Sequence, residues 1–229
     1  MAMNLTDWAG APRPEHKVID GRYAGLEPLD PARHGGDLWR SALAPGAEDR
    51  FRYLFEGPPA DAVVFDAWLQ RAASSDDPLF FAVIDRATGR AEGRQALMRI
   101  DPAHGVIEIG SILWGPAIAR SRVTTEALFL TASYVFDQLG YRRFEWKCNA
   151  LNAPSRRAAQ RFGFRYEGLF RQHMVVKGES RDTTWFAMID ADWPRIKAGY
   201  EAWLAPGNFD EAGRQRQALD VGCTDPPAP

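Results

Sequence analysis

The strongest constraint on the fold is the central part of the chain, where strand and helix patterns alternate. Residues 79–114 hold three apolar runs separated by the turn sequences ATGR and DPAHG, which predicts an antiparallel meander. A long helical pattern over 122–141 follows, then an alternating strand pattern over 142–149 and a short helix over 152–164. A meander that continues into strand, helix, strand and helix predicts an α+β fold with a mixed sheet and helices on its faces.

Helix-start and helix-end signals support these assignments. Asp30 and Pro31 have the N-cap and first-turn chemistry of an early helix, and Asn152 and Pro154 have the same chemistry later in the chain. Gly140 marks the end of the long helix. The remaining elements are expected as a strand near 23–26, helices near 32–44, 61–74 and 192–205, and two strands in 165–190 joined at KGES.

One domain accounts for most of the length. The chain has 229 residues, which suits a single globular domain over residues 18–205 that ends in the terminal helix. Residues 1–17, rich in Pro, Gly and charge, are expected to form an arm across that domain. Residues 206–229 form a polar tail that ends in DPPAP, and we expect this tail to be partly disordered.

Charge and cysteine content indicate which classes of partner and which cellular compartment to expect. The formal net charge of −2 argues against broad electrostatic binding of nucleic acid or an anionic membrane. Cys148 lies in an apolar run and Cys223 in the polar tail, so neither a disulfide framework nor a zinc site is expected. No signal peptide and no apolar run long enough for a membrane span is recognisable. A cytoplasmic protein without a bound metal is therefore expected, and a homodimer is left open.

The loop that leads into the long helix has the features of an anion site. A loop that reaches a helix N-terminus presents unpaired N–H groups and the positive end of the helix dipole. Arg120 and Arg122 add charge here, and Ser121, Thr124 and Thr125 add hydroxyl donors. These features predict a pyrophosphate site. The alternative interpretation is that the same residues only cap an exposed helix.

A second segment downstream could complete such a site. The strand WKCNALN leads into a helix that opens with Asn152 and Ser155. If this strand and the strand before the long helix splay apart, their unpaired edges could bind an extended, amide-containing arm such as pantetheine. The alternative is that Asn152 is only an N-cap.

The two segments together resemble the GNAT acyltransferases, and within them the RimJ/RimL-type branch. The similar stretches are IEIGSILWGPAIARSRVTTEALFL and the run from YRRFEWKCN to WFAMID, within a resemblance over roughly residues 20–195. The resemblance implies a GNAT fold, with a twisted, mostly antiparallel sheet that splays at the cofactor cleft. It also implies transfer of an acetyl group from acetyl-CoA (coenzyme A) to a primary amine in a ternary complex.

The phosphate loop departs from the pattern of this family, which reads Q/R-x-x-G-x-G/A. Ala119 stands at the first position, Arg122 at the first glycine and Thr124 at the small residue. Losing the glycine removes close backbone approach and easy access to a positive φ. We therefore expect fewer N–H contacts to phosphate and more side-chain contacts, because charge-assisted bonds from arginine are strong.

The resemblance places the site residues. Glu108 is the candidate base, Ser155 the candidate acid toward the CoA thiolate, and the backbone N–H groups near Leu113 and Trp114 the candidate oxyanion donors. The residues expected to bind the cofactor are Leu113, Trp114, Ile118, Arg120, Ser121, Arg122, Val123, Thr124, Thr125, Asn152 and Ser155.

Each of these roles has a structural alternative. Glu108 could be a salt-bridged strand residue, and Ser155 an ordinary first-turn serine. His173 and Glu145 are alternative functional groups, and Asp182 is expected to be structural. Two further sets remain open: Trp114 and Trp185 as core or cleft wall, and Arg156, Arg157 and Arg161 as phosphate ligands or a solvated face.

The acceptor is the least constrained part of the prediction. Its pocket is expected between the early helices around Trp39 and Trp68 and the closing hairpin around His173. The branch includes enzymes that act on protein N-termini, amino acids, polyamines and antibiotics. Two other functions are considered: a non-catalytic acyl-CoA-binding module, and a nucleotide-binding protein of another α/β type, which lacks support because neither GxGxxG nor GxxxxGK[ST] is present.

Overall fold

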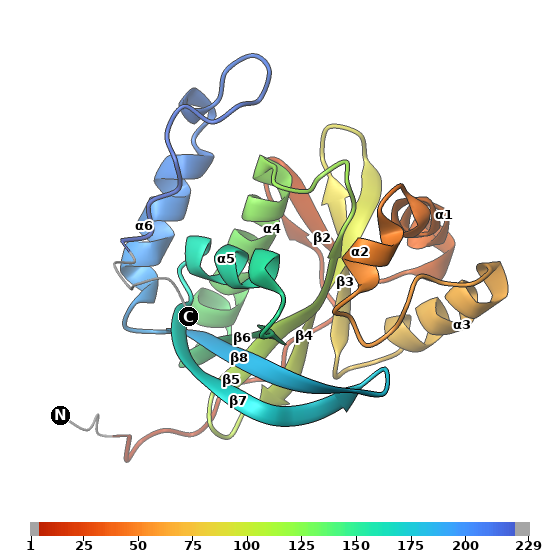
Figure 1. Cartoon of the computed structure of the whole chain (residues 1–229). Coiled ribbons are helices and arrows are strands. Elements are labelled where there is room, and N and C mark those ends of the chain that lie inside the picture. Colours follow the sequence, from red (N-terminus) through yellow and green to blue (C-terminus); the bar gives the residue numbers. More distant parts are fainter. Residues whose placement is uncertain (1–4, 223–229) are drawn as a thin grey trace.

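The computed structural model describes residues 5–222, in which eight strands form one sheet with helices on both faces (Figure 1). Across the sheet the strands follow the order β1-β2-β3-β4-β5-β6-β8-β7. Only β5 and β6 pair in parallel, which confirms the predicted mixed, mostly antiparallel sheet. The strands are β1 (Ile19–Asp20), β2 (Ala24–Pro28), β3 (Leu79–Asp85), β4 (Arg90–Asp101), β5 (Val106–Trp114), β6 (Arg143–Asn149), β7 (Arg165–Val176) and β8 (Glu179–Ile189).

The helices follow the predicted start signals. Asp30 accepts hydrogen bonds from the N–H groups of Ala32 and Arg33 and so caps the first helix. No helix within residues 5–222 has both the length and the hydropathy needed to cross a bilayer. The helices are α1 (Pro31–Leu43), α2 (Ala47–Phe51), α3 (Ala62–Ala73), α4 (Arg122–Ser133), α5 (Ala153–Arg161), α6 (Trp193–Leu204) and a 3₁₀ turn (Pro206–Asn208).

Three elements differ from the sequence prediction. The long helix is α-helical only through Ser133 and continues as a π-helix, Tyr134–Gln138, before Gly140 adopts a φ of 68°. The short elements α2 and β1 were not predicted. Elements of this length contain too few residues to produce a recognisable hydrophobic period.

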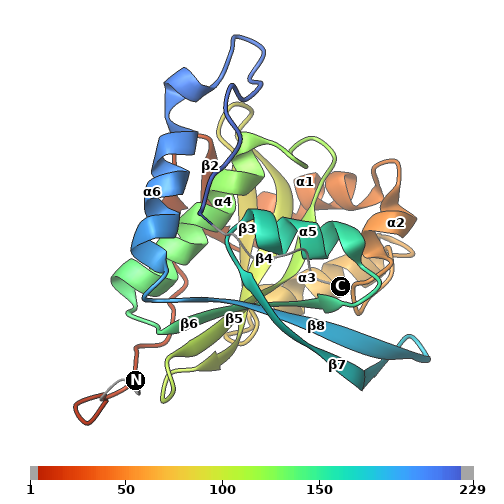
Figure 2. The same ribbon diagram turned by 60° about the vertical axis from the view of Figure 1, so that its left-hand side comes forward.

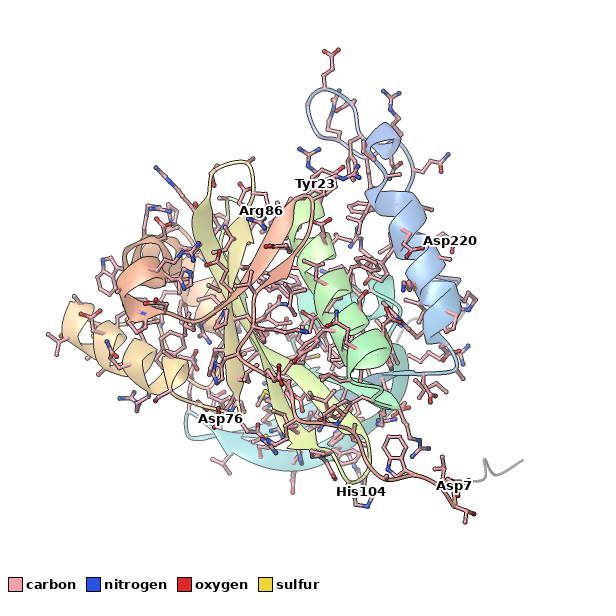
Figure 3. All side chains as sticks on the ribbon, turned by 180° about the vertical axis from the view of Figure 1, so that it is seen from behind. Asp7, Tyr23, Asp76, Arg86, His104 and Asp220 are labelled. Carbon is pink, nitrogen blue, oxygen red and sulfur yellow. The ribbon has the colours of Figure 1, made fainter. Side chains whose placement is uncertain are left out.

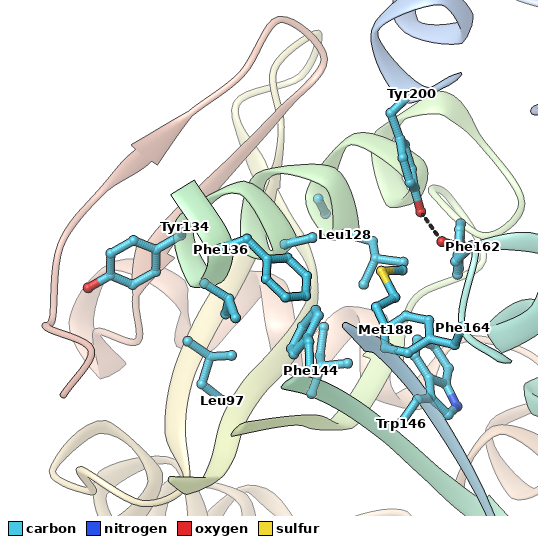
Figure 4. Packing of buried hydrophobic residues seen from close by; sticks show 14 of the residues in the cluster. Leu97, Leu128, Tyr134, Phe136, Phe144, Trp146, Phe162, Phe164, Met188 and Tyr200 are labelled. Carbon is cyan, nitrogen blue, oxygen red and sulfur yellow. Dashed lines mark hydrogen bonds between the residues drawn. The ribbon is translucent and has the colours of Figure 1, made fainter. Parts of the chain in front are cut away.

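The two faces of the sheet are buried by different helices. On one face, α4, α5 and α6 cover a large aromatic core that includes Phe144, Phe164 and Met188 (Figure 4). In that core the Tyr200 hydroxyl donates to the Phe162 carbonyl at 3.0 Å. On the other face, α1 and α3 cover only the half of the sheet that contains β3 and β4. On β5 and β6 the rest of this second face carries charged side chains, among them Glu108, Glu145 and Lys147.

Helix α4 is also tied to the start of the sheet through Glu126. Its buried carboxylate accepts hydrogen bonds from the backbone N–H groups of Arg22, Tyr23 and Ala24. The glutamate in the T-T-E-A sequence therefore anchors β2 against α4. This contact fixes the position of the α4 N-terminus relative to the sheet.

Both ends of the described chain pack on the domain. The N-terminal arm runs along the back of the molecule past the β4–β5 turn (Figure 3), where the Trp8 indole donates to the Ala103 carbonyl at 2.7 Å. The predicted partly disordered tail from residue 206 instead folds back beside α6 and buries Phe209 and Val221. Two apolar residues in a polar stretch are enough to attach it. Cys223 and the DPPAP end lie outside the described residues.

Candidate active site

The site is a split between the two parallel strands. Strands β5 and β6 pair from Val106 and Arg143 up to Ile109 and Trp146, although both continue further. This is the predicted splay. Beyond it a cavity of about 130 Å³ opens between the strands. Because the strands part there, the cavity takes residues from both faces of the sheet.

A bulge in β5 shapes one wall of the cavity. Ser111 adopts a φ of 49° where the register with β4 shifts, and its carbonyl accepts a hydrogen bond from Arg94 Nη1 at 3.2 Å. The wall consists of Gly110, Ser111 and Ile112. The Leu113 side chain packs with α1 and α2 instead, and the Trp114 indole donates to Gln95 Oε1 at 3.1 Å. The strand backbone that borders the cavity thus lies slightly before the predicted oxyanion donors.

Glu108 lies on the floor of the cavity and is only 3% exposed. Its Oε2 accepts a hydrogen bond from Arg99 Nη1 at 2.7 Å and lies 3.0 Å from Lys147 Nζ. Burial raises the pKa of Glu108, and the charges of Lys147 and Arg99 oppose this rise. Glu108 is therefore both a salt-bridged strand residue and a titratable carboxylate in the cleft, which suits a general base.

The alternative base Glu145 has a different role. Its carboxylate binds Lys147 Nζ at 2.7 Å and Arg143 Nε at 2.7 Å, away from the cavity. Glu145 thus holds the lysine that contacts Glu108. His173, the other alternative, does line the cavity, where its Nδ1 is 3.0 Å from Thr183 Oγ1.

Ser155 and Asn152 line the opposite side of the cavity at the start of α5. Asn152 caps the helix by accepting a hydrogen bond from the Ser155 N–H at 3.1 Å. The Ser155 hydroxyl accepts a hydrogen bond from the Trp146 indole at 3.0 Å and also interacts with the Cys148 thiol, whose pKa is raised by burial. Because its oxygen accepts from the indole, the hydroxyl keeps its proton to donate, either to the Cys148 sulfur or to another sulfur atom in the cavity.

The hydroxyl groups at the start of α4 serve the helix itself. Ser121 Oγ accepts from the Val123 N–H at 3.1 Å and donates to the Ile118 carbonyl at 2.6 Å. The hydroxyls of Thr124 and Thr125 donate to the Ser121 carbonyl at 3.1 and 3.2 Å. The prediction that these hydroxyls are donors for phosphate is therefore not supported by this geometry. Ile118, Val123, Thr124 and Thr125 are all buried.

The two loop arginines also differ from expectation. The positive φ of the loop, 57°, falls on the exposed Arg120 and not on Arg122. Arg122 is the first residue of α4, so an arginine in place of the family's glycine is not strained there. Its guanidinium lies 4.4 Å over the Tyr23 ring and 5.4 Å over the Phe209 ring. Arg120 is left as the exposed cation of the loop.

One side of the cavity combines the predicted hairpin around His173 with a segment after α2 that was not predicted. The segment after α2 contributes Tyr53 and Phe55, and the β7–β8 hairpin contributes His173 and Arg181. Figures 1 and 2 show this hairpin extending beyond the helix-covered part of the sheet. The segment after α2 forms the roof of the cavity, and two hydrogen bonds hold it in place. The Tyr53 hydroxyl donates to the Leu151 carbonyl at 3.2 Å, and the Lys177 ammonium donates to the Phe51 carbonyl at 2.9 Å.

Some predicted acceptor residues lie elsewhere. Trp39 and Trp68 pack against Phe65 in the second core, and Trp68 borders a separate apolar cavity beside α3. Asp182 accepts a hydrogen bond from the Gln172 N–H at 2.6 Å, so its predicted structural role agrees with the hairpin geometry. The sequence analysis did not assign Tyr53 and Phe55 to the site. The aromatic residues in DRFRYLFEGPP were the sequence signal that could have indicated this role.

Sequence comparison agrees with this geometry. The acetyltransferase (GNAT) domain family matches residues 27–165. The chain belongs to this family. A crystal structure of a GCN5-related N-acetyltransferase from Brucella melitensis is 60% identical and has a TM-score of 0.92, with 94% of this chain and 97% of that chain covered.

Two further relatives extend the comparison. The uncharacterized N-acetyltransferase p20 of Bacillus licheniformis is 29% identical over 117 residues, which are 49% of this chain and 63% of that protein's length. RimL, a ribosomal-protein acetyltransferase solved in complex with CoA, is 19% identical, with a TM-score of 0.65 over 76% of this chain and 99% of that chain. The GNAT chain thus shares its fold with RimL, consistent with the resemblance to the RimJ/RimL-type branch.

The family match ends at residue 165, the first residue of β7. The cavity residues His173 and Arg181 therefore lie outside the matched range.

Proposed function

We propose that this GNAT protein transfers an acetyl group from acetyl-CoA to a primary amine, by direct attack within a ternary complex. The observation that carries the proposal is the cavity at the β5–β6 split, with Glu108 on one face of the sheet and Ser155 on the other. Such an opening lets a donor and an acceptor approach each other from opposite faces.

The residues on the α5 side fit acetyl-CoA. The edges of β5 and β6 beyond Ile109 and Trp146 do not pair with each other and can take the pantetheine amides as an added strand. The start of α4, with Arg120 exposed beside it, suits the diphosphate. Because the hydroxyls of this loop cap the helix, we expect the phosphates to rely on N–H groups and on arginine.

The chemical step needs a neutral amine. An alkyl ammonium has a pKa of about 10, so roughly one molecule in a thousand is deprotonated at pH 7. Glu108 accepts the amine proton as the nitrogen attacks the thioester carbonyl carbon. The N–H groups of the bulge near Ser111 stabilise the oxyanion. As the tetrahedral intermediate collapses, the carbon–sulfur bond breaks and the CoA thiolate takes a proton from Ser155. Water then returns a proton to the serine oxygen, and Glu108 releases its proton to solvent.

The test is CoA release over a panel of amines, amino acids and peptides with wild-type protein and Glu108→Gln. We expect Glu108→Gln to lower kcat by about 10² to 10⁴-fold with little change in the KM for acetyl-CoA. Ser155→Ala should lower kcat less, because water can protonate the thiolate. Glu179→Gln, at the exposed end of the hairpin, is the matched control and should behave as wild type.

A second candidate, a non-catalytic acyl-CoA-binding module, is motivated by the altered phosphate loop. It predicts CoA binding without turnover for any amine, and unchanged binding in Glu108→Gln and Ser155→Ala. Turnover that depends on Glu108 would exclude it.

A further inference from the structure

Arg181 is a buried cation without a partner. It lies on β8, is 8% exposed and lines the same cavity as Glu108. Within residues 5–222 its guanidinium makes no hydrogen bond and no ion pair, and its Nε is fully buried without a partner. The guanidinium lies 5.4 Å over the Phe55 ring.

Other arginines in this protein are placed differently. Arg94, also deeply buried, is paired with Glu56 and donates to the Ser111 carbonyl. Arg143 is bonded to both Glu145 and Glu167. The fold therefore supplies partners for arginine at these positions, and at Arg181 it does not.

An unpaired buried guanidinium is costly. Desolvation of an ion costs several kcal/mol even after relaxation, unless an opposite charge compensates it. The nearby carboxylate Glu108 is already bound by Arg99 and Lys147. Burial lowers the pKa of Arg181, and the electrostatic attraction of Cys148 and Glu108 only partly opposes this effect. No described carboxylate forms an ion pair with Arg181, because Glu108 is already paired with Arg99 and Lys147.

We propose that Arg181 binds a carboxylate of the acceptor, and hence that the acceptor is a small primary amine that also carries a carboxylate, in the simplest case an amino acid. This inference rests on the proposed acetyl transfer. The planar guanidinium can hold both carboxylate oxygens at once. The acceptor amine then points to Glu108, and Phe55 covers the ligand from the roof. A single unpaired cation matches one negative charge, which favours a carboxylate over a phosphate dianion.

The experiment compares matched acceptors with wild type, Arg181→Met and Arg181→Lys. The acceptors are amino acids, their carboxamides, peptides with a distant C-terminus, and a phosphate-bearing amine of similar size. We expect wild type to prefer the amino acids. Arg181→Met should lower kcat/KM for amino acids by about 10 to 100-fold, mainly through KM, because charge-assisted hydrogen bonds are lost. Its activity on carboxamides and its KM for acetyl-CoA should not change.

Two controls separate charge from folding. Arg181→Lys keeps the charge and should retain part of the preference for carboxylates. Arg171→Met changes an exposed arginine on the same hairpin and should leave all acceptors unaffected. Thermal melting checks that each variant is folded.

Several results would overturn the inference while leaving acetyl transfer intact. These are equal turnover of amino acids and carboxamides by wild type, an equal loss on both in Arg181→Met, and a preference for peptides or for the phosphate-bearing amine. If no amine is acetylated, the proposed function fails separately. In that case, calorimetry with N-acetyl amino acids tests whether Arg181 binds a carboxylate. Binding that requires both the carboxylate and Arg181 supports the proposed site. Binding that is unchanged in Arg181→Met refutes it.

Discussion

Glu108 faces two opposing demands at the scale of single residues. Burial favours its neutral form, but a base has to be ionised before it can accept a proton. Arg99 and Lys147 bind the same carboxylate oxygen and favour the charged form. Glu145 in turn neutralises part of the charge on Lys147. The pKa of Glu108 therefore depends on a small network and remains raised.

Arg99→Met should move the acidic limb of the pH profile to higher pH. Removing this cation takes away an interaction that lowers the pKa of Glu108, so the pKa rises further. The base is active above its pKa, so kcat/KM at pH 6 should fall several-fold and recover at alkaline pH. The check is the pH dependence of kcat/KM, with Arg90→Met, at the exposed start of β4, as control. An unmoved limb would mean that another group titrates.

At the scale of elements, the start of α5 and the parting strands β5 and β6 meet at the site. Helix α5 begins at the cavity with Asn152 as its cap, and α4 begins beyond the loop that leaves β5. The Asn152 cap was predicted from residue type, because capping depends on neighbours within three residues. The opening itself is produced by the parting of β5 from β6, so the site depends on the sheet and not on the helix alone.

Asn152→Ala and Asp61→Ala form a matched pair of cap variants. Each removes a side chain that accepts a hydrogen bond near a helix start, from Ser155 or from Val64. Both should lower the free energy of unfolding by about 1 kcal/mol. Only Asn152→Ala should also raise the KM for acetyl-CoA, because only Asn152 lines the cavity. Equal acetyl-CoA kinetics in both variants would argue against a role for Asn152 in binding the donor.

At the scale of the whole molecule, distant parts of the chain hold the start of α4. Glu126 binds the backbone before β2, and Arg122 stacks on Tyr23 from that same segment. Phe209, from beyond α6, completes the stack and packs on Trp203 with ring centroids 5.0 Å apart. The C-terminal segment thus contributes to the wall behind the phosphate loop.

Phe209→Ala should lower the free energy of unfolding by about 3 kcal/mol, because a buried aromatic side chain is lost. Urea denaturation provides the measurement. Glu211→Ala, an exposed neighbour, should stay within about 0.5 kcal/mol of wild type. If Phe209→Ala were as stable as wild type, the segment after α6 would not be packed in solution.

The sequence alone determined the longer elements, their order and the class of fold, whereas the short elements α2 and β1 were not predicted. Caps at Asp30 and Asn152, turns at Gly89 and Gly105, and the helical period from residue 122 are local signals, so they can be read without the fold. The family pattern also located the opening, since its motifs are contiguous stretches of chain.

Only the tertiary structure decided which way the functional side chains turn. The hydroxyl of Thr124 faces its own helix, Arg122 faces the rings of Tyr23 and Phe209, and Tyr53 reaches across to the β6–α5 loop. The same holds for Arg181, whose isolation depends on Arg99 and other groups far away in sequence. Burial and charge compensation are sums over neighbours that meet only after folding, so no local pattern could have revealed that this one cation lacks a partner.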